Sequence, residues 1–335
     1  MHEPEIFGHL PDGRAVHRVW ISGGGLRASV LTIGAILQDL RLDGVDHPLI
    51  LGAETLPPYL GPMNYFGAIV GRYANRLRDA RVHAGGRDWA LDRNWLGAHI
   101  LHGGQGGVST LLWDIAERTE NSVTLTLTSP HGDMGFPGGL QITARIALEP
   151  DCAMRVEITA TTDAETPCNL CQHPYFILDD TGSIVDHAFQ IAAESYLPAD
   201  EATLPTGEIA PVAGTAFDFR TARALGRQEI DHNFCLSDAR APLRPVAQLR
   251  SATLAMDLET TEPGLQVFTA PSFPEQGHPG LEGRLYRPFA GIALEAQSWP
   301  DAPNQPHFPP AMLQPGAVYR SLTRYRFSRL QGQDQ

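Results

Sequence analysis

The chain has 335 residues, of which 42% are hydrophobic and 19% are charged, and its formal net charge is -13. Such acidity, with no dense cluster of Lys or Arg, excludes a nucleic-acid-binding surface, and no apolar run approaches the roughly 18 residues that cross a membrane. The start MHEPEIFGHL lacks the positive charge and apolar stretch of a secretory signal, and four cysteines are too few for a disulfide scaffold, so we expect a soluble cytoplasmic protein.

Two short polar clusters come early in the chain. The sequence GRYANRL at residues 71–77 offers Asn75 and Arg76, and LHGG at residues 101–104 offers His102 beside flexible glycine backbone. Amide, guanidinium and imidazole groups are suited to binding hydroxyls. Taken separately, each cluster also fits a solvated arginine or an ordinary glycine turn.

The middle of the chain alternates apolar and polar residues between turn signals. Residues 122–128 (SVTLTLT), 140–148 (LQITARIAL) and 154–160 (MRVEITA) each fit a half-buried strand. Helical periodicity is poor, although residues 223–228 could form one helical turn. We predict an all-β protein with one domain over residues 1–335, in which so many strands bury their apolar faces by stacking sheet on sheet.

The segment PCNLCQHPYFIL at residues 167–178 is the first candidate for chemistry. An extended strand there places Cys171, His173 and Tyr175 on one face, because side chains alternate along a strand. A polar face among apolar neighbours indicates a site. For the histidine taken alone, however, the simpler interpretation is an imidazole with satisfied hydrogen bonds inside a sheet.

The same segment contains Cys168 and Cys171 at CxxC spacing, which suggests a zinc or redox motif. We reject both, because the chain has no second such pair and a strand directs these two side chains to opposite faces. Both cysteines are expected to be small buried hydrophobes.

The last third of the chain holds a candidate carboxylate. In FAGIALEAQSW, residues 289–299, alternation places aliphatic side chains on one face and Glu295 on the other, beside Gly and Ala residues that leave room for a ligand. The simpler alternative is a surface glutamate on an edge strand. Upstream, DHNFCL adds Asp231 at the start of a short strand, and residues 264–269 (GLQVFT) alternate like another strand.

Taken in order, these segments resemble the aldose 1-epimerase (galactose mutarotase) family over nearly the whole chain. The resemblance is carried by a series of motifs: ILGAETLPPYL, YFGAIVGRYANRL, LHGGQGG, HGDMGFPGGL, HPYF, YLPADEATLPTGEIAPVAGTAFDFR, DHNFCL, EPGLQVFT and ALEAQSWPDAPNQPHFPP. It implies a galactose mutarotase-like β-supersandwich of stacked antiparallel sheets, in agreement with the strand pattern.

The resemblance also implies roles for individual residues. His173 corresponds to the catalytic acid and Glu295 to the catalytic base. The sugar-binding positions fall on Asn75, Arg76, His102, Asp231 and Gln266, and Tyr175 lies beside the acid. The implied partner is a small aldose sugar, bound by a monomer or homodimer that needs no metal or organic cofactor.

The departures from the family pattern gather near the acid. The usual TNHxYFNL is here Cys171 to Leu178, CQHPYFIL, with three flanking positions changed. The family's TGN after the Gln266 strand is TAP, and Glu262 replaces the Gln of its QPG turn. His173 and Glu295 are retained, so these changes bear on which aldose is preferred.

The chemistry explains why these two residue types are needed. Opening a cyclic hemiacetal requires a base for the anomeric hydroxyl proton and an acid for the ring oxygen. We expect Glu295 as the base and a protonated His173 as the acid, with the His173 pKa raised by Glu295 or Asp231.

Three other functions remain as alternatives. They are a sugar-phosphate mutarotase, a non-catalytic sugar-binding or regulatory protein on the same fold, and a glycosidase that uses Asp231 and Glu295. The net acidity disfavours the first. Retention of both His173 and Glu295 disfavours the second, and the third leaves His173 without a role.

Overall fold

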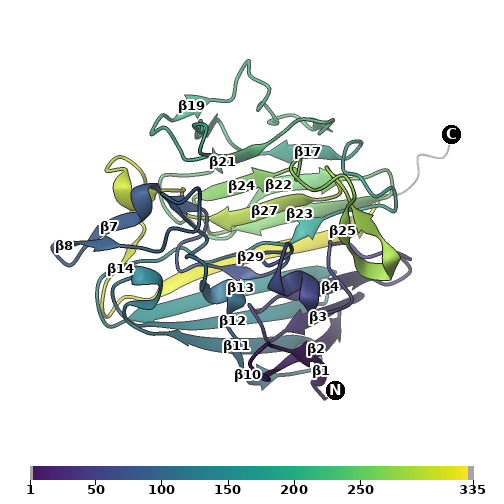
Figure 1. Cartoon of the computed structure of the whole chain (residues 1–335). Coiled ribbons are helices and arrows are strands. Elements are labelled where there is room, and N and C mark those ends of the chain that lie inside the picture. The colour runs from purple at the N-terminus through teal and green to yellow at the C-terminus, as the bar shows by residue number, and fades with distance from the viewer. Residues whose placement is uncertain (1–2, 331–335) are drawn as a thin grey trace.

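The computed structural model describes residues 3–330, which are built almost entirely of strands (Figure 1). Every strand ladder among these residues is antiparallel, and three sheets contain most of the strands. The helical elements in the described chain are 3₁₀ turns of three or four residues: Pro57–Leu60, Arg78–Ala80, Val108–Thr110, Asp133–Gly135, Leu281–Gly283 and Ala302–Asn304. The predicted all-β class with stacked antiparallel sheets is confirmed, whereas the single domain over 1–335 stays a prediction.

The largest sheet has nine strands and runs through both halves of the molecule (Figure 1). Its spatial order is β10 (Asp114–Arg118), β11 (Ser122–Ser129), β12 (Leu140–Glu149), β13 (Ala153–Thr162), β29 (Tyr319–Arg329), β23 (Leu254–Thr260), β22 (Arg244–Arg250), β17 (Ala188–Ile191) and β20 (Arg223–Ala224). The strands predicted at 122–128, 140–148 and 154–160 are thus β11, β12 and β13. The expectation that residues 223–228 could form a helical turn was wrong, because Arg223 and Ala224 form the extended strand β20, which pairs with β17.

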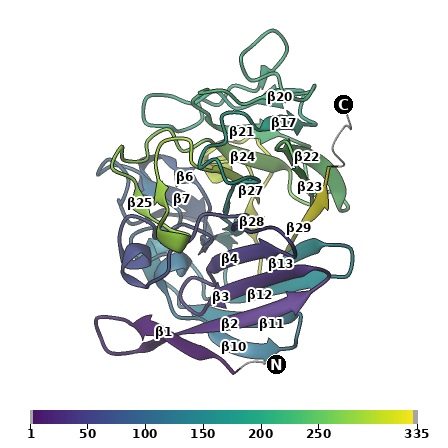
Figure 2. The same cartoon turned by 90° about the vertical axis from the view of Figure 1, so that its right-hand side faces the viewer.

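A four-stranded sheet formed by the N-terminal part of the chain covers one half of this large sheet (Figure 2). Its order is β1 (Glu5–His9), β2 (Ala15–Gly23), β3 (Leu26–Leu31) and β4 (Leu37–Leu42). Strand β2 packs against β11 and β12, so the two sheets stack face to face.

A six-stranded sheet lies in the other half of the molecule. Its order is β16 (Tyr175–Phe176), β27 (Ile292–Gln297), β24 (Gly264–Phe268), β21 (Asp231–Cys235), β18 (Ser195–Tyr196) and β19 (Ala210–Pro211). Two-stranded ladders complete the structure: β14 (Thr166–Pro167) with β28 (Met312–Leu313), β15 (Cys171–Gln172) with β5 (Ile69–Val70), β6 (Arg76–Leu77) with β9 (Ile100–Leu101), β7 (Arg81–Ala84) with β8 (Arg87–Ala90), and β25 (His278–Pro279) with β26 (Leu285–Tyr286).

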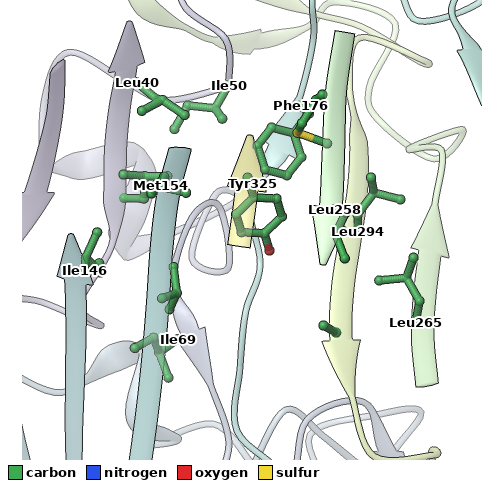
Figure 3. Packing of buried hydrophobic residues seen from close by; sticks show 14 of the residues in the cluster. Leu40, Ile50, Ile69, Ile146, Met154, Phe176, Leu258, Leu265, Leu294 and Tyr325 are labelled. Atoms are coloured by element: carbon green, nitrogen blue, oxygen red, sulfur yellow. The ribbon is translucent and has the colours of Figure 1, made fainter. Parts of the chain in front are cut away.

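The main hydrophobic core is shared by all three sheets. It contains Leu40 of β4, Met154 of β13, Leu258 of β23 and Leu294 of β27, each fully buried (Figure 3). The period-two alternation seen in the sequence supplies these inward side chains. Burying each of them contributes about 1.5–3 kcal/mol, so the core holds the sheets together and gives the site a rigid base.

The segment at residues 167–178 is not the single extended strand that we expected. It is divided among three partners: β14 pairs with β28, β15 pairs with β5, and β16 pairs with β27. Each short strand ends where the segment leaves one neighbouring strand and reaches the next. His173 lies between β15 and β16 and is still held in place by its backbone, since its N–H donates to the Ala68 carbonyl (2.9 Å) and its carbonyl accepts from the Gly67 N–H (2.8 Å).

Arg72 fixes the loop that leads into the first polar cluster. Its buried guanidinium donates to four backbone carbonyls and to the Ser129 hydroxyl, at distances between 2.7 and 3.0 Å. The four carbonyls belong to Ser129, Pro130, Pro137 and Gly138. Within residues 3–330 no helix has the length and apolar character needed to span a membrane.

Candidate active site

A pocket of about 570 Å³ opens beside the six-stranded sheet. Its walls combine the sheet with the two early polar clusters and the connection between β18 and β19. The lining residues that carry polar or aromatic groups are Tyr65, Asn75, Arg76, Trp95, His102, His173, Tyr175, Asp200, Thr203, Glu229, Asp231, His232, Phe268, Ser272 and Glu295.

The register of three strands explains why polar side chains gather on one sheet face. Asn233 of β21 pairs with Gln266 of β24, and Gln266 pairs with Glu295 of β27. Directly paired residues share a face, and so do residues two apart on one strand, which adds Asp231. Gln266 donates from Nε2 to Asp231 Oδ1 at 2.6 Å.

His173 and Glu295 form a contact at the inner wall of this pocket. The distance from His173 Nε2 to Glu295 Oε1 is 3.3 Å, and their side chains are only 5% and 3% exposed. The two groups come from separate elements, β27 for Glu295 and the link between β15 and β16 for His173. Their contact therefore depends on the pairing of β16 with β27.

Burial changes the proton affinities of both groups. It raises the pKa of Glu295 to about 8, helped by the nearby Asp231 and opposed by the Arg76 guanidinium and the Cys171 thiol. It lowers the pKa of His173 to about 4. The prediction that carboxylates raise the His173 pKa is therefore wrong for this pocket, because loss of hydration on burial is the largest influence on this imidazole.

Between these two pKa values the pair holds one proton. The proton can reside on Glu295 beside a neutral imidazole, or on His173 beside a carboxylate, and the two arrangements have the same net charge. Since only a short proton shift across the 3.3 Å contact separates them, the macroscopic values belong to the pair. Such a pair can donate and accept a proton in one reaction.

His102 is held as a neutral hydrogen-bond donor. Its Nδ1 accepts the backbone N–H of Asn75 at 3.1 Å, which leaves the ring hydrogen on Nε2. The ring is buried, and burial holds its pKa well below the usual value, with His173 and Arg76 acting in the same direction. His102 is therefore suited to donate to a ligand oxygen in the pocket.

His102, His173 and Glu295 are also close enough to hold a metal ion, since one ligand atom from each lies within 4.8 Å of the others. The tautomer of His102 argues against that use. With Nδ1 occupied by Asn75, the ring would have to lose either this hydrogen bond or its Nε2 proton to bind a metal. The expectation of a site without metal stays a prediction.

Arg76 is positioned by both charge and stacking. Its Nη2 lies 3.4 Å from Asp231 Oδ2, and its guanidinium stacks 4.5 Å from the centre of the Trp95 ring. Asn75 adopts a left-handed backbone with φ +63°, and its Oδ1 accepts the Arg76 N–H at 2.9 Å. These contacts hold a cation in the pocket wall beside the Asp231 carboxylate.

The structure brings together all eight residues expected at the site. Seven line the pocket: Asn75, Arg76, His102, His173, Tyr175, Asp231 and Glu295. Gln266 is the exception, because it is 2% exposed and contacts Asp231 without lining the pocket.

Sequence reasoning missed several pocket residues. Tyr65 packs 4.7 Å from the His102 ring, and Trp95 supports Arg76. Asp200 and Thr203 come from the connection between β18 and β19. Tyr65 and Asp200 fall inside the motifs YFGAIVGRYANRL and YLPADEATLPTGEI, which could have indicated them, whereas Trp95 lies in no such motif.

The two CxxC cysteines are free and buried, as expected. Cys168 belongs to the main core, whereas Cys171 packs with Val70 and Ala74 in a separate small cluster. They therefore face different surroundings.

Comparisons with known proteins agree with this geometry. A family model described as aldose 1-epimerase matches residues 18–326. The galactose mutarotase of Mus musculus is 38% identical over 338 residues, which cover 96% of this chain and 97% of that protein. The aldose 1-epimerase of Escherichia coli K12 is 33% identical over 337 residues, which cover 95% and 96% of the two chains.

A solved structure shows the same architecture. The GalM/aldose epimerase homologue from C. elegans superposes with a TM-score of 0.88 at 26% identity, covering 95% of this chain and 100% of that one. The similarity thus extends over nearly the full length in both sequence and structure.

Proposed function

The chain belongs to the aldose 1-epimerase family, and we propose that it interconverts the α and β anomers of free aldoses with His173 and Glu295 as the proton-transfer pair. The observation that carries the proposal is the 3.3 Å contact between His173 Nε2 and Glu295 Oε1 inside a pocket. A group that only binds sugar needs neither an acid nor a base there.

The reaction proceeds by ring opening. Glu295 takes the proton of the anomeric hydroxyl, His173 gives a proton to the ring oxygen, and the bond between C1 and that oxygen breaks to leave an open aldehyde. Rotation about the bond between C1 and C2 turns the other carbonyl face toward the ring oxygen. On closure the protons return to their donors, so the pair ends as it began.

This direction of transfer requires the proton to be on His173 when the sugar is bound. Sugar hydroxyls that donate to Glu295 stabilise its carboxylate form, and the Arg76 guanidinium acts in the same sense. The bound sugar therefore favours the charged arrangement over the neutral one that burial favours in the empty pocket.

The remaining pocket residues hold the sugar while its ring is open. Arg76 and the His102 Nε2–H supply donors, and Asp231 supplies acceptors on a carboxylate fixed by Gln266. Holding the reactant in one orientation keeps the aldehyde from escaping and speeds closure.

The charges of the pocket bear on the substrate class. Arg76 is the one arginine or lysine among the residues that line the pocket, and it is paired with Asp231. Asp200, Glu229 and Glu295 add further carboxylates. A phosphate group would meet more negative than positive charge, so we propose neutral aldoses over sugar phosphates. A cytoplasmic monomer or homodimer remains part of the proposal.

Polarimetry tests this function. Freshly dissolved α-glucose, α-galactose, xylose and arabinose are followed with wild-type protein and with the His173→Ala and Glu295→Ala variants. We expect wild type to accelerate the approach to the equilibrium rotation for at least one sugar and both variants to lose most of that acceleration. No acceleration of any of the four by wild type would contradict the proposal.

A further inference from the structure

Glu295 has one hydrogen-bonding contact on the side away from His173. Its Oε2 lies 3.9 Å from Cys171 Sγ, and this thiol is the one hydrogen-bond donor to Oε2 among the described residues. Oε1 instead faces His173. The two carboxylate oxygens therefore have different partners, one belonging to the proton-transfer pair and one belonging to the wall behind it.

Cys171 is suited to act as a lasting donor. It is 2% exposed, and burial beside Glu295 and Glu262 raises its pKa well above the usual value, so the sulfur keeps its hydrogen. It does not line the 570 Å³ pocket and so makes no contact with a bound sugar. Any effect on the reaction must therefore pass through Glu295.

Gln297 completes this arrangement. It lies two residues beyond Glu295 on β27 and therefore faces the same side of the strand. Its Oε1 is 3.7 Å from Cys171 Sγ, and its buried Nε2 has no partner within the described structure. Turning the amide over directs Nε2–H to the sulfur and leaves the single thiol hydrogen for Glu295.

We propose that Cys171, supported by Gln297, is a positioning residue for Glu295. The thiol donates a hydrogen bond to Oε2 on the side away from His173. This contact directs Oε1 toward His173 and the sugar, and it stabilises the carboxylate form that a base needs. This role rests on the proposed mutarotase function.

Other charged and titratable groups also surround this carboxylate. They are His173, His102, Asp231, Arg76, Tyr175 and Tyr325 around Glu295, with Glu262 beyond Cys171. None of these groups changes when Cys171 is replaced, so a shift in the Glu295 titration caused by that replacement reports the thiol contact.

The first test compares the pH dependence of kcat/KM in Cys171→Ala, Cys171→Ser and wild type, with Cys168→Ala as a matched control. Cys168 is equally buried and belongs to the main core. We expect Cys171→Ala to move the alkaline limb upward by about 0.5 pH unit and Cys171→Ser, which keeps a donor, to reverse most of that shift. Cys168→Ala should leave the limb unmoved. Identical profiles for wild type and both Cys171 variants would overturn the proposal.

The second test needs no activity. Raman spectroscopy follows the S–H stretching bands as the pH is raised. We expect the band that disappears in Cys171→Ala to move to lower frequency as Glu295 ionises, and to stop moving in Glu295→Gln, while the Cys168 band stays constant. A Cys171 band independent of pH would refute the contact. If wild type fails to accelerate mutarotation, the proposed function falls, and the Raman titration still decides whether the thiol holds this carboxylate.

Discussion

The Nε2 atom of His173 lies 3.3 Å from the Oε1 atom of Glu295, and the two side chains are almost completely buried. Burial disfavours the charged form of each group. It therefore lowers the pKa of His173, whose charged form carries the proton, and raises the pKa of Glu295, whose charged form has lost it. The pair consequently holds one proton across the neutral range, which is the condition for a concerted acid and base.

The first prediction concerns the pH dependence of the reaction. Activity needs one proton on the pair, so kcat/KM should fall below about pH 4, where His173 takes a second proton, and above about pH 8, where Glu295 loses the last one. Polarimetry of α-galactose from about pH 3.5 to about pH 9.5 measures the two limbs. An activity that is constant across this range would rule out the shared proton.

The second prediction concerns stability. A carboxyl whose pKa is raised on folding contributes stability that is complete below its unfolded value of 4.5 and is lost as pH rises through about 8. Glu295→Gln removes this loss, so its free energy of unfolding should match wild type near pH 4.5 and exceed it increasingly toward pH 9. The rise from 4.5 to about 8 corresponds to an upper limit of roughly 5 kcal/mol. Urea unfolding at several pH values measures the difference, and a variant less stable than wild type at pH 9 would contradict the cause we assign.

The third prediction separates the two nitrogens of His102. His102→Gln can still present an N–H to the pocket but loses the acceptor for the Asn75 N–H. His102→Asn keeps an acceptor for Asn75 near the backbone, but its side chain is too short to present an N–H to the pocket. If the Nε2–H binds the sugar, His102→Asn should raise KM by about 2- to 10-fold and His102→Gln by less, with kcat changed little in both. The reverse order in steady-state kinetics would show that the Asn75 contact matters more.

The fourth prediction assigns Gln266 an indirect role. Because it donates to Asp231 and does not line the pocket, Gln266→Leu should raise KM by releasing that carboxylate. Asp231→Ala should raise KM by about 10- to 100-fold, as expected for a hydrogen bond to a charged group. In the double variant the Gln266 change should add almost nothing, whereas multiplication of the two effects would mean that Gln266 contacts the sugar itself.

The sequence predicted the strands of the core well, because each buries one face. Residues 140–148, for example, alternate over most of their length and form β12 nearly as expected. Residues 167–178 were expected to form one extended strand but change partners twice, and the sequence of a segment carries little information about which strands pair with it. The length of that strand was therefore overestimated.

The site was predicted chiefly through the family resemblance. Strand periodicity placed Glu295 on a face with room for a ligand, but it could not bring Asn75, Arg76 and His102 into the same pocket, since loops closed by contacts such as Asn75 to His102 set their position. The direction of the His173 pKa was also missed. A sequence shows which charges are present, whereas the degree of burial that decides between hydration and charge appears only in the folded chain.

The shared proton is tested most directly by a double-mutant cycle on kcat for α-galactose with His173→Gln, Glu295→Gln and the double variant. Each single change should lower kcat by about 10²–10⁴-fold. The kcat of the double variant should be no lower than that of the slower single variant, because either change already disables the pair. Losses that multiply in the double variant, or full activity in either single variant, would contradict the account.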